Sequence, residues 1–470
     1  MRVLSRLFLM GLFLPAAALA ECPADPGWLP ATPRLVSTSA PPRHPAPDCP
    51  FYQSAWQTML AATQPDSNGQ PAFIRDYSTI ADLFSPEVAV GFATRKTGLL
   101  SLAPRTLQRP NEKLPSEKLK APAISAGVNQ AGTLRGLLID QNGNPIFYAI
   151  HVNDVFAQFI RQNKLTTRDA LINADPEALQ FPTGAIELKS AWQIVEGAAA
   201  PANYFTTRAL VPLLEIKNGD IVLSSSNREV TVALLAIHVV FVLKDHPEFI
   251  WSTFEHVGAD GQGLRDNAPV APSNPKSVAT GTLISQADWT LYRAGTTSDK
   301  ANIPNTAQDR INTFDASLQK FSKGGKTLQT SVYRSFPASK VDGVDEDGDV
   351  SAVNKSMAQL FAAKTPGAFD RRRNYQLVGA IWLDDPTKFK SGMLFQNKDD
   401  ESTDAPGAML AGEGALSSTA MESFTQIDQQ NCFSCHNTKR VTDDLTGKQI
   451  MAAKRLNVSH VLSKFLSESQ

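Results

Sequence analysis

Cysteine and histidine are scarce in this chain, which has four and seven of them among 470 residues. An excess of one charge is also missing, since 45 Lys and Arg stand against 46 Asp and Glu. Proteins that bind nucleic acid or anionic membranes through their charge need a basic patch, and no basic stripe is present. Beyond residue 20 there is no apolar run long enough to cross a bilayer. The sequence therefore predicts a globular product that neither spans a membrane nor binds nucleic acid.

Residues 1–20 have the pattern of a secretory signal peptide. Two arginines lie among the first six residues, an apolar run follows at 7–14, and a small-residue cleavage site lies at 18–20. The apolar run is too short for a membrane anchor. We therefore expect cleavage before Glu21 and export of the mature chain to the periplasm.

A proline-rich leader follows at 21–50 and carries Cys22 and Cys49. Nine prolines between 23 and 50 indicate an extended segment with almost no periodic apolar pattern. In an oxidising compartment the two cysteines are expected to form a disulfide, and two unpaired thiols are the alternative.

The rest of the chain predicts the α+β class. Alternating apolar and polar residues indicate a β-rich core over 134–257, to which 373–383 could add a strand. A helix is expected at 51–62, and helical patterns at 418–429 and 448–466 predict a helical C-terminal part. After the leader, the expected regions are a β-rich core region with an N-terminal helix at 51–257, a mixed α/β region with long loops at 258–405, and a helical region at 406–470.

The most specific motif is Cys432-Phe433-Ser434-Cys435-His436. Cys-x-x-Cys-His is the attachment sequence of a c-type haem, in which both thiols form thioethers and the histidine ligates the iron on its proximal side. On a helix, positions i, i+3 and i+4 share one face. A zinc site would need a second spaced pair of ligands, and a thioredoxin-type redox pair would need a βαβ setting. The sequence therefore predicts one covalent haem c at Cys432 and Cys435, with His436 as the proximal ligand.

The position of the motif is unusual. Only 34 residues follow His436, too few for the usual small cytochrome c domain, whose distal methionine lies well downstream. Met451 and His460 are the only candidates for a sixth iron ligand after the motif, and Met451 fits an amphipathic helix better. The distal side is therefore expected to come from residues before the motif.

Four histidines of the β-rich core are candidates for that side: His151, His238, His246 and His256. His256 ends a strand just before a glycine-rich loop, where sites often gather, and it is the first choice, with a structural role as the alternative. His238 lies inside an apolar strand and is interpreted as a hydrogen-bonded core residue. His246 precedes a proline and is interpreted as a turn residue, and His151 is a weaker candidate.

Two further groups of charged residues have both a functional and a simpler interpretation. Glu187 and Lys189 share one face of a predicted strand, so one could alter the pKa of the other as an acid–base pair, or they could form a weak exposed ion pair. An acidic loop suggests either a calcium site or a solvated loop, although it fails the EF-hand spacing. Its residues are Asp342, Asp345, Asp347 and Asp349.

Several stretches, in order along the chain, resemble an uncharacterised family of exported bacterial proteins described as cytochrome c family proteins. The matching stretches are 54–57 (SAWQ), 184–192 (GAIELKSAW), 251–256 (WSTFEH) and 421–424 (MESF) leading into the Cys-x-x-Cys-His motif. The resemblance implies a single covalent haem near the C-terminus of a large body, and no established reaction. It also implies that Glu187, Lys189 and His256 line the haem pocket, since they lie in the matching stretches.

The leading hypothesis is a mono-haem c-type protein that transfers electrons or performs redox chemistry at its haem. The first alternative is a haem enzyme of the peroxidase or oxygenase kind, because a pure carrier does not need so large a body. Its acid–base groups would be His256 and Glu187, with Lys189 beside them. The second alternative is a ligand-binding or sensing module in which the haem only relays a signal. The redox partner or substrate is not indicated by the sequence.

Overall fold

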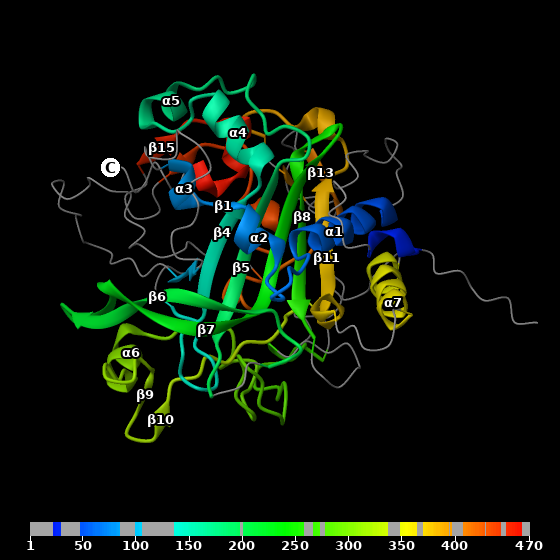
Figure 1. Cartoon of the computed structure of the whole chain (residues 1–470). Helices are drawn as coiled ribbons and strands as arrows, with labels where there is room; N and C mark the ends of the chain where they lie inside the picture. Colours follow the sequence, from blue (N-terminus) through cyan, green and yellow to red (C-terminus); the bar gives the residue numbers. More distant parts are fainter. Residues whose placement is uncertain are drawn as a thin grey trace, which may run out of the picture.

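A large, mainly antiparallel β-sheet forms the centre of the molecule (Figure 1). The computed structural model describes residues 22–29, 48–84, 99–105, 136–197, 201–257, 267–272, 278–336, 348–363, 370–393, 395–396, 408–427, 429–442 and 448–462. Within these residues the fold combines the sheet with helices packed on it, so the predicted α+β class is confirmed.

Eleven strands make up the sheet. Along its main path the strands are β1 (Ser78–Thr79), β4 (Phe147–Val152), β5 (Ile186–Ile194), β7 (Asp220–Leu243), β8 (His246–His256), β11 (Tyr375–Leu383), β13 (Ala408–Gly412) and β12 (Phe395–Gln396). Three further strands join at the side: β2 (Leu100–Ser101), β3 (Ala103–Pro104) and β6 (Thr206–Lys217). Strands from all three expected regions after residue 50 thus share one sheet, and the strand expected at 373–383 is confirmed as β11.

The central strand is β7, which pairs with β5 and β8 through its second half and with β6 through its first half. Residues 232–243 are buried at every position, because both faces of the sheet are covered there. This explains why the sequence of this strand is apolar without alternation. The neighbouring strands β5 and β8 also carry polar residues, and several of these lie on the face of the sheet that the C-terminal segments cover.

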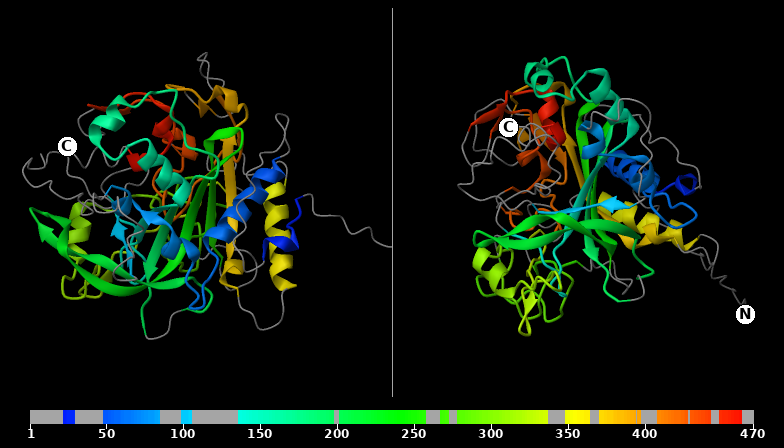
Figure 2. Two further views of the ribbon diagram at one scale, coloured as in Figure 1. Left: turned by 45° about the horizontal axis from the view of Figure 1, so that its top comes forward. Right: turned by 60° about the vertical axis from the view of Figure 1, so that its left-hand side comes forward.

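Seven α-helices lie within the described residues: α1 (Cys49–Ala62), α2 (Ala72–Asp76), α3 (Ile80–Phe84), α4 (Asp154–Gln162), α5 (Arg168–Asn173), α6 (Ala307–Thr313) and α7 (Asp349–Ala362). The helices α1 and α7 pack on one face of the sheet, against β11, and the C-terminal segments lie on the other (Figure 2). The predicted helix at 51–62 is confirmed as α1. Local signals fix helix starts, since the Asn153 side chain accepts a hydrogen bond from Phe156 N at 3.1 Å and caps α4.

The expected helical C-terminal part is wrong over most of its described residues. Residues 418–427 form turns, and β14 (Val441–Thr442) pairs with β15 (Gln449–Met451). Two short 3-10 helices flank this strand pair along the chain, at Cys432–Ser434 and at Arg455–Val458. Within the described part of this region, α-helical backbone begins only at His460.

Residues 418–427 do not form the expected helix because their serine and threonine side chains make hydrogen bonds to a neighbouring strand and to the backbone. Ser418 Oγ and Thr419 Oγ1 both donate to Glu255 on β8, at 2.9 and 3.2 Å. Ser423 Oγ donates to Thr419 O. Short polar side chains that offer the backbone such partners disfavour a regular helix. The segment is therefore fixed to the sheet as a series of turns.

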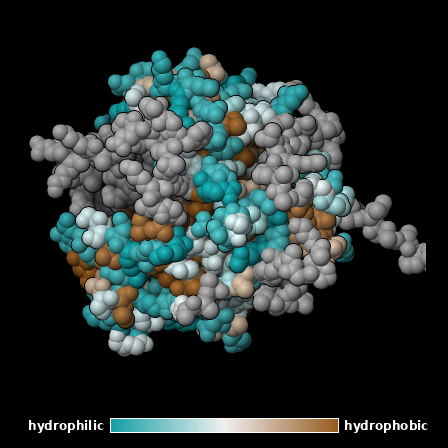
Figure 3. Space-filling model, viewed as in Figure 1, coloured by the Kyte–Doolittle hydropathy of each residue, from teal (hydrophilic) through white to brown (hydrophobic). Residues whose placement is uncertain are grey.

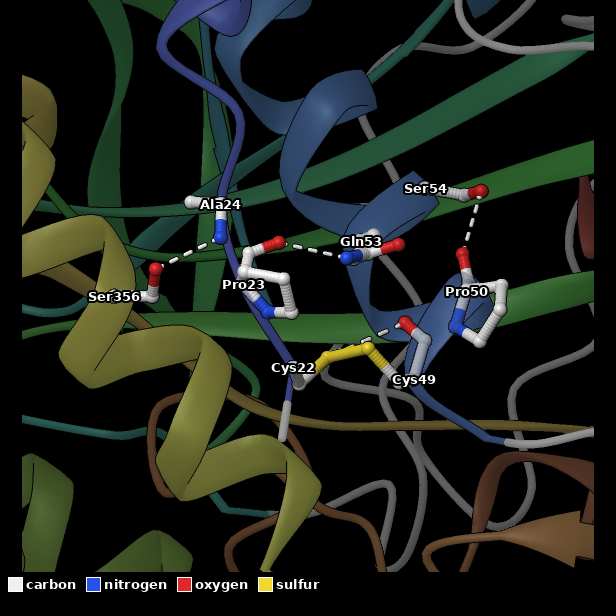
Figure 4. The surroundings of a disulfide bond; sticks show 8 residues. All are labelled: Cys22, Pro23, Ala24, Cys49, Pro50, Gln53, Ser54 and Ser356. Carbon is white, nitrogen blue, oxygen red and sulfur yellow. Dashed lines mark hydrogen bonds between the residues drawn. A yellow bond between two sulfur atoms is a disulfide. The ribbon is translucent and has the colours of Figure 1, made fainter. Parts of the chain in front are cut away.

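The predicted disulfide between Cys22 and Cys49 is confirmed, with Cα atoms 5.5 Å apart (Figure 4). It joins the described part of the leader to the start of α1. Two hydrogen bonds support the junction, from Ala24 N to Ser356 Oγ of α7 at 2.8 Å and from Gln53 Nε2 to Pro23 O at 2.7 Å. Such a bond is compatible with an exported protein.

Some expectations fall on residues outside the described part. These are the signal peptide at 1–20, most of the leader and the acidic loop, of which only Asp349 is described. In the described helices, none is both long and apolar enough to cross a membrane. On the face seen in Figure 3 the apolar residues lie in separate groups among polar ones, several of them in the lower part of the view.

Candidate functional site

The Cys-x-x-Cys-His motif forms a tight turn. The 3-10 helix η6 (Cys432–Ser434) begins at the first cysteine, and His436 N donates to Cys432 O at 2.9 Å, so the turn closes as in an α-helix. Neither cysteine is in a disulfide, and both residues are partly exposed. The Cys435 thiol contacts Gln429 Oε1 at 3.2 Å. The two sulfurs and the imidazole thus come from one turn of backbone, as the sequence predicts, although this turn lies outside an α-helix.

The imidazole of His436 is held in one orientation. Its Nδ1 lies 2.9 Å from the carbonyl oxygen of Val458, which can only accept, so Nδ1 carries the proton and Nε2 keeps its lone pair. Histidines that ligate a metal usually donate their other ring N–H in this way. Burial, the nearby His460 and the charge of Lys189 hold the His436 pKa well below its ordinary value. His436 is therefore neutral and suited to ligate iron through Nε2.

Two aromatic rings pack against His436. The ring centroid of Trp251 on β8 lies 4.0 Å away, and that of His460 lies 3.9 Å away in a stacked arrangement. Burial and the charge of Lys189 lower the pKa of His460 to about 4, although its contact with the Cys435 carbonyl, 3.3 Å from Nε2, acts the other way. His460 thus presents its ring face to His436, the residue that would hold the iron of a bound haem. The other downstream candidate, Met451, is buried in an apolar cluster.

The sheet face beneath the motif carries a row of polar residues. Lys189 on β5 is opposite His238 on β7, and His238 is opposite Thr253 on β8. In the neighbouring row Glu187 aligns with Trp251 across β7. Because side chains alternate between the faces of a strand, all five project to the side on which the motif lies. The structure therefore brings Glu187 and Lys189 to the motif.

His238 is part of a buried polar chain. Its Nε2 lies 3.1 Å from both carboxylate oxygens of Glu422, and its Nδ1 lies 2.9 Å from Thr253 Oγ1. Burial alone would raise the pKa of Glu422, but His238, the charge of Lys189 and the backbone N–H of Ser418 outweigh it and bring that pKa to about 2. The carboxylate is therefore ionised near neutral pH. The pKa of the Cys432 thiol is raised mainly by burial and, to a smaller extent, by the negative charge of Glu422.

Glu187 is almost fully buried, and Ser459 Oγ donates to its Oε2 at 2.7 Å. Burial raises the pKa of this carboxyl to about 7, although the Ser459 hydroxyl and the charge of Lys189 act in the opposite direction. Glu187 can therefore exchange a proton near neutral pH. It also ties β5 to the segment that carries Val458 and His460.

Replacement of Glu187 with Gln is expected to stabilise the protein above neutral pH. The folded pKa of about 7 lies above the ordinary 4.5, so the favourable contribution of the protonated carboxyl is complete below pH 4.5 and lost by pH 7 and above. A neutral Gln avoids this loss, which the two pKa values put at about 3 kcal/mol. Urea unfolding at pH 5 and pH 8 measures the gain. Glu215→Gln, on the exposed end of β6, is the control and should show no pH-dependent gain. An equal effect of E187Q at both pH values would contradict the assignment.

The other predicted histidines lie elsewhere. His256 stacks on Tyr204, with centroids 3.5 Å apart, and the pleat turns it to the α1 face, away from the motif. His151 lies on that same face against Phe73. The expectation of a turn residue is wrong for His246, which is the buried first residue of β8, paired with Leu243, and its Nδ1 lies 2.9 Å from Glu248 Oε1. The structure thus does not bring His256 to the haem motif.

Sequence reasoning missed Glu422, Trp251 and the pairing of His238 with Glu422. Glu422 and Trp251 both lie in stretches that carry the family resemblance, which is the one signal that could have selected them. His238 was predicted to be a hydrogen-bonded core residue, and it is hydrogen-bonded. Its partner, however, lies 184 residues away along the chain, so only the fold reveals the pair.

Comparison of the chain with protein-family models, with curated proteins and with solved structures gives no match. Among the residues described here, no three or more His, Cys, Asp or Glu side chains are grouped to hold a metal ion. A zinc site at the two cysteines would need such a group. Haem differs, since the thioethers hold the cofactor and the protein needs to supply only one iron ligand.

Proposed function

We propose that this chain is an exported, periplasmic c-type haem protein with a single haem, which transfers electrons or performs redox chemistry. The haem is bound covalently by Cys432 and Cys435, and His436 is the proximal ligand. The observation that carries the proposal is the hydrogen bond from His436 Nδ1 to Val458 O beside two cysteines of the same turn that form no disulfide. This arrangement fixes the histidine tautomer that iron ligation requires. The signal-peptide pattern and the Cys22–Cys49 disulfide agree with attachment outside the cytoplasm.

Each residue of the site has a distinct part in this proposal. A bound haem would supply reversible one-electron chemistry at its iron. Trp251 packs against the ring of His436 and restricts its rotation. The Val458 carbonyl accepts a hydrogen bond from Nδ1–H, which makes the imidazole a stronger electron-pair donor at Nε2. The apolar neighbours of Phe433, which include Phe395 at 5.2 Å between centroids, keep water from one side of the turn.

Covalent haem is tested by producing the full chain together with haem c maturation machinery. After denaturation and gel separation, the protein band should retain haem, and the pyridine haemochrome spectrum should be that of a haem with two thioethers. Cys432→Ser and Cys435→Ser should each shift that spectrum toward a single thioether. Ser434→Ala, within the same turn, is the matched control and should retain both. A wild-type chain that is exported and folded without bound haem would contradict the proposal.

A haem enzyme is the second candidate, and one observation favours it. The chain of Thr253, His238 and Glu422 places a positioned imidazole–carboxylate pair beside Lys189 on the face next to the motif. Such a pair can hold and deliver a proton, which a carrier does not need. Here His238 takes the part that the sequence suggested for His256.

Carbon monoxide separates the two candidates. Prompt binding to the ferrous protein indicates an open sixth position and favours the enzyme, whereas absence of binding with a six-coordinate spectrum favours the carrier. In the enzyme case, His238→Gln should lower peroxide turnover at least tenfold with haem content unchanged. Equal turnover in the variant would remove His238 from the reaction.

A further inference from the structure

The peptide group between Val458 and Ser459 is held by hydrogen bonds on both sides. Its carbonyl oxygen lies 2.9 Å from His436 Nδ1, and its N–H donates to Leu456 O at 3.2 Å. The side chain of Ser459 donates through Oγ to Glu187 Oε2 at 2.7 Å. Val458 and Ser459 are fully buried and Glu187 is 5% exposed, so water has little access to these bonds. The carbonyl that His436 uses is thus tied to the sheet through one serine and one carboxyl group.

Glu187 belongs to a rigid part of the fold. Its strand β5 lies inside the sheet, where Glu187 is opposite Val152 on β4 and Val240 on β7. Both neighbouring strands form hydrogen bonds with β5, so the backbone that carries the carboxyl group is restrained on two sides. Groups supported by such strands position a site more precisely than groups on loops. Glu187 is therefore a fixed anchor for the residues that contact His436.

The part of the chain before Val458 has anchors of its own. Asn457 Nδ2 donates to Lys439 O at 2.6 Å and to Ala452 O at 2.9 Å. Neither bond involves β5. Loss of the bond to β5 should therefore leave this part of the chain folded and change mainly the orientation of the Val458 carbonyl.

We propose that Glu187 is a positioning residue for the haem iron ligand: through Ser459 it fixes the Val458 carbonyl, which in turn selects the ring orientation and tautomer of His436. The role of His436 as the iron ligand rests on the proposed function, whereas its tautomer is a property of the chain alone. A partner that holds the second ring nitrogen of a ligating histidine orients the ring and raises its donor strength. Glu187 thus acts on the iron through His436, and it need not touch the cofactor.

The test begins with the full mature chain, produced with isotope-labelled histidine and without haem c maturation machinery. Burial lowers the pKa of His436, so its imidazole is neutral at pH 7, and nitrogen NMR then distinguishes the two tautomers. The signal of His436 is the one that His436→Gln removes. The ratio of the Nδ1–H to the Nε2–H tautomer should fall about fivefold in Glu187→Met and in Ser459→Ala, the effect of losing one neutral hydrogen bond. An unchanged ratio in both variants would overturn the proposal.

Two matched variants separate positioning from a general loss of stability. Glu187→Gln keeps an oxygen that accepts from Ser459, so it should retain the wild-type ratio that Glu187→Met loses. Ser252→Ala removes another buried hydroxyl, which donates to Val239 O at 2.6 Å on β8, but Ser252 lies on the α1 face. It should leave the ratio unchanged. If Ser252→Ala lowers the ratio as Ser459→Ala does, or if Glu187→Gln behaves like Glu187→Met, the proposal fails.

The same variants with attached haem report on the iron. A weaker hydrogen bond at Nδ1 makes His436 a poorer electron-pair donor, which favours ferrous over ferric iron. The reduction potential should therefore rise in Glu187→Met and in Ser459→Ala, and keep the wild-type value in Glu187→Gln. The measurement is made at pH 5, where Glu187 is itself uncharged because burial raises its pKa to about 7. The variants then differ from the wild type in the hydrogen bond and not in charge.

Failure of this proposal differs from failure of the proposed function. A folded wild-type chain without bound haem contradicts the proposed function, and the tautomer ratio of the haem-free chain then decides on Glu187 alone. A haem-containing wild type, together with an unchanged ratio and an unchanged potential in Glu187→Met, contradicts the positioning role and leaves the proposed function standing.

Discussion

Replacement of Glu255 with Ala is expected to destabilise the protein by about 3–5 kcal/mol, the usual effect of removing one partner of a buried ion pair. Glu255 Oε2 pairs with Arg334 at 2.8 Å, and both side chains are at most 2% exposed. Its Oε1 accepts from Ser418 Oγ, Thr419 N and Thr419 Oγ1. The variant would leave a buried guanidinium and three donors without their acceptor. Urea unfolding of the wild-type protein and of the variant measures the difference in unfolding free energy.

An exposed ion pair of the same sheet provides the control. Glu229 on β7 pairs with Arg208 on β6, and Arg208 is mostly exposed, so Glu229→Ala should cost less than about 1 kcal/mol. Glu255→Leu combined with Arg334→Met should recover much of the lost stability, because no buried charge then lacks a partner. A loss below 1 kcal/mol for Glu255→Ala would show that water or another group replaces the carboxylate.

The same variant should loosen the segment that carries the haem motif. Ser418 and Thr419 fix residues 418–427 to β8 through Glu255, and Arg334 Nη1 donates to Ser417 O at 2.8 Å. Faster hydrogen exchange confined to residues 417–436 would accompany the lower stability.

If this chain is the proposed haem protein, replacement of His436 with Gly is expected to change the haem spectrum strongly while the haem stays attached. Both thioethers remain, but the iron loses its proximal nitrogen, so the visible spectrum should take the form of a haem without axial histidine. Added imidazole should restore the wild-type spectrum, since the cavity left by the ring is bounded by Trp251 and His460. Absorption spectra of the ferric and ferrous proteins, with and without imidazole, measure both effects.

His256→Ala is the matched control for this experiment. Its ring lies on the α1 face, stacked on Tyr204, so the spectrum should remain that of the wild type. An unchanged spectrum in His436→Gly would remove His436 as the iron ligand. A changed spectrum in His256→Ala would mean that the sheet transmits an effect of that residue to the haem.

The contrast between Glu255 and His256 shows why the sequence misplaced one candidate. The segment 251–256 is correctly predicted as a strand, but the expectation that its end places His256 at the motif is not met. The period of a strand is two, so neighbouring residues face opposite sides of the sheet. Trp251, Thr253 and Glu255 therefore project toward the haem motif, whereas His256 projects toward α1. Periodicity predicts the alternation, but which side holds the C-terminal segment depends on how the chain returns to the sheet.

Local patterns in the sequence determined the main strands, the first helix and the disulfide. The alternation in β5 and the continuous apolar run of β7 are properties of consecutive residues, and the two leader cysteines needed only an oxidising compartment. The spacing of Cys432, Cys435 and His436 likewise placed the predicted attachment site within a single turn.

Tertiary structure decided everything that joins distant parts of the chain. The registers between β5, β7 and β8 bring Lys189, His238 and Thr253 into one row, and register is set by which face becomes buried. Residues 418–427 form turns because Glu255 offers their side chains an acceptor 163 residues away. Val458 likewise reaches His436 through the tertiary fold. These positions follow from packing against the sheet, and no local pattern encodes them.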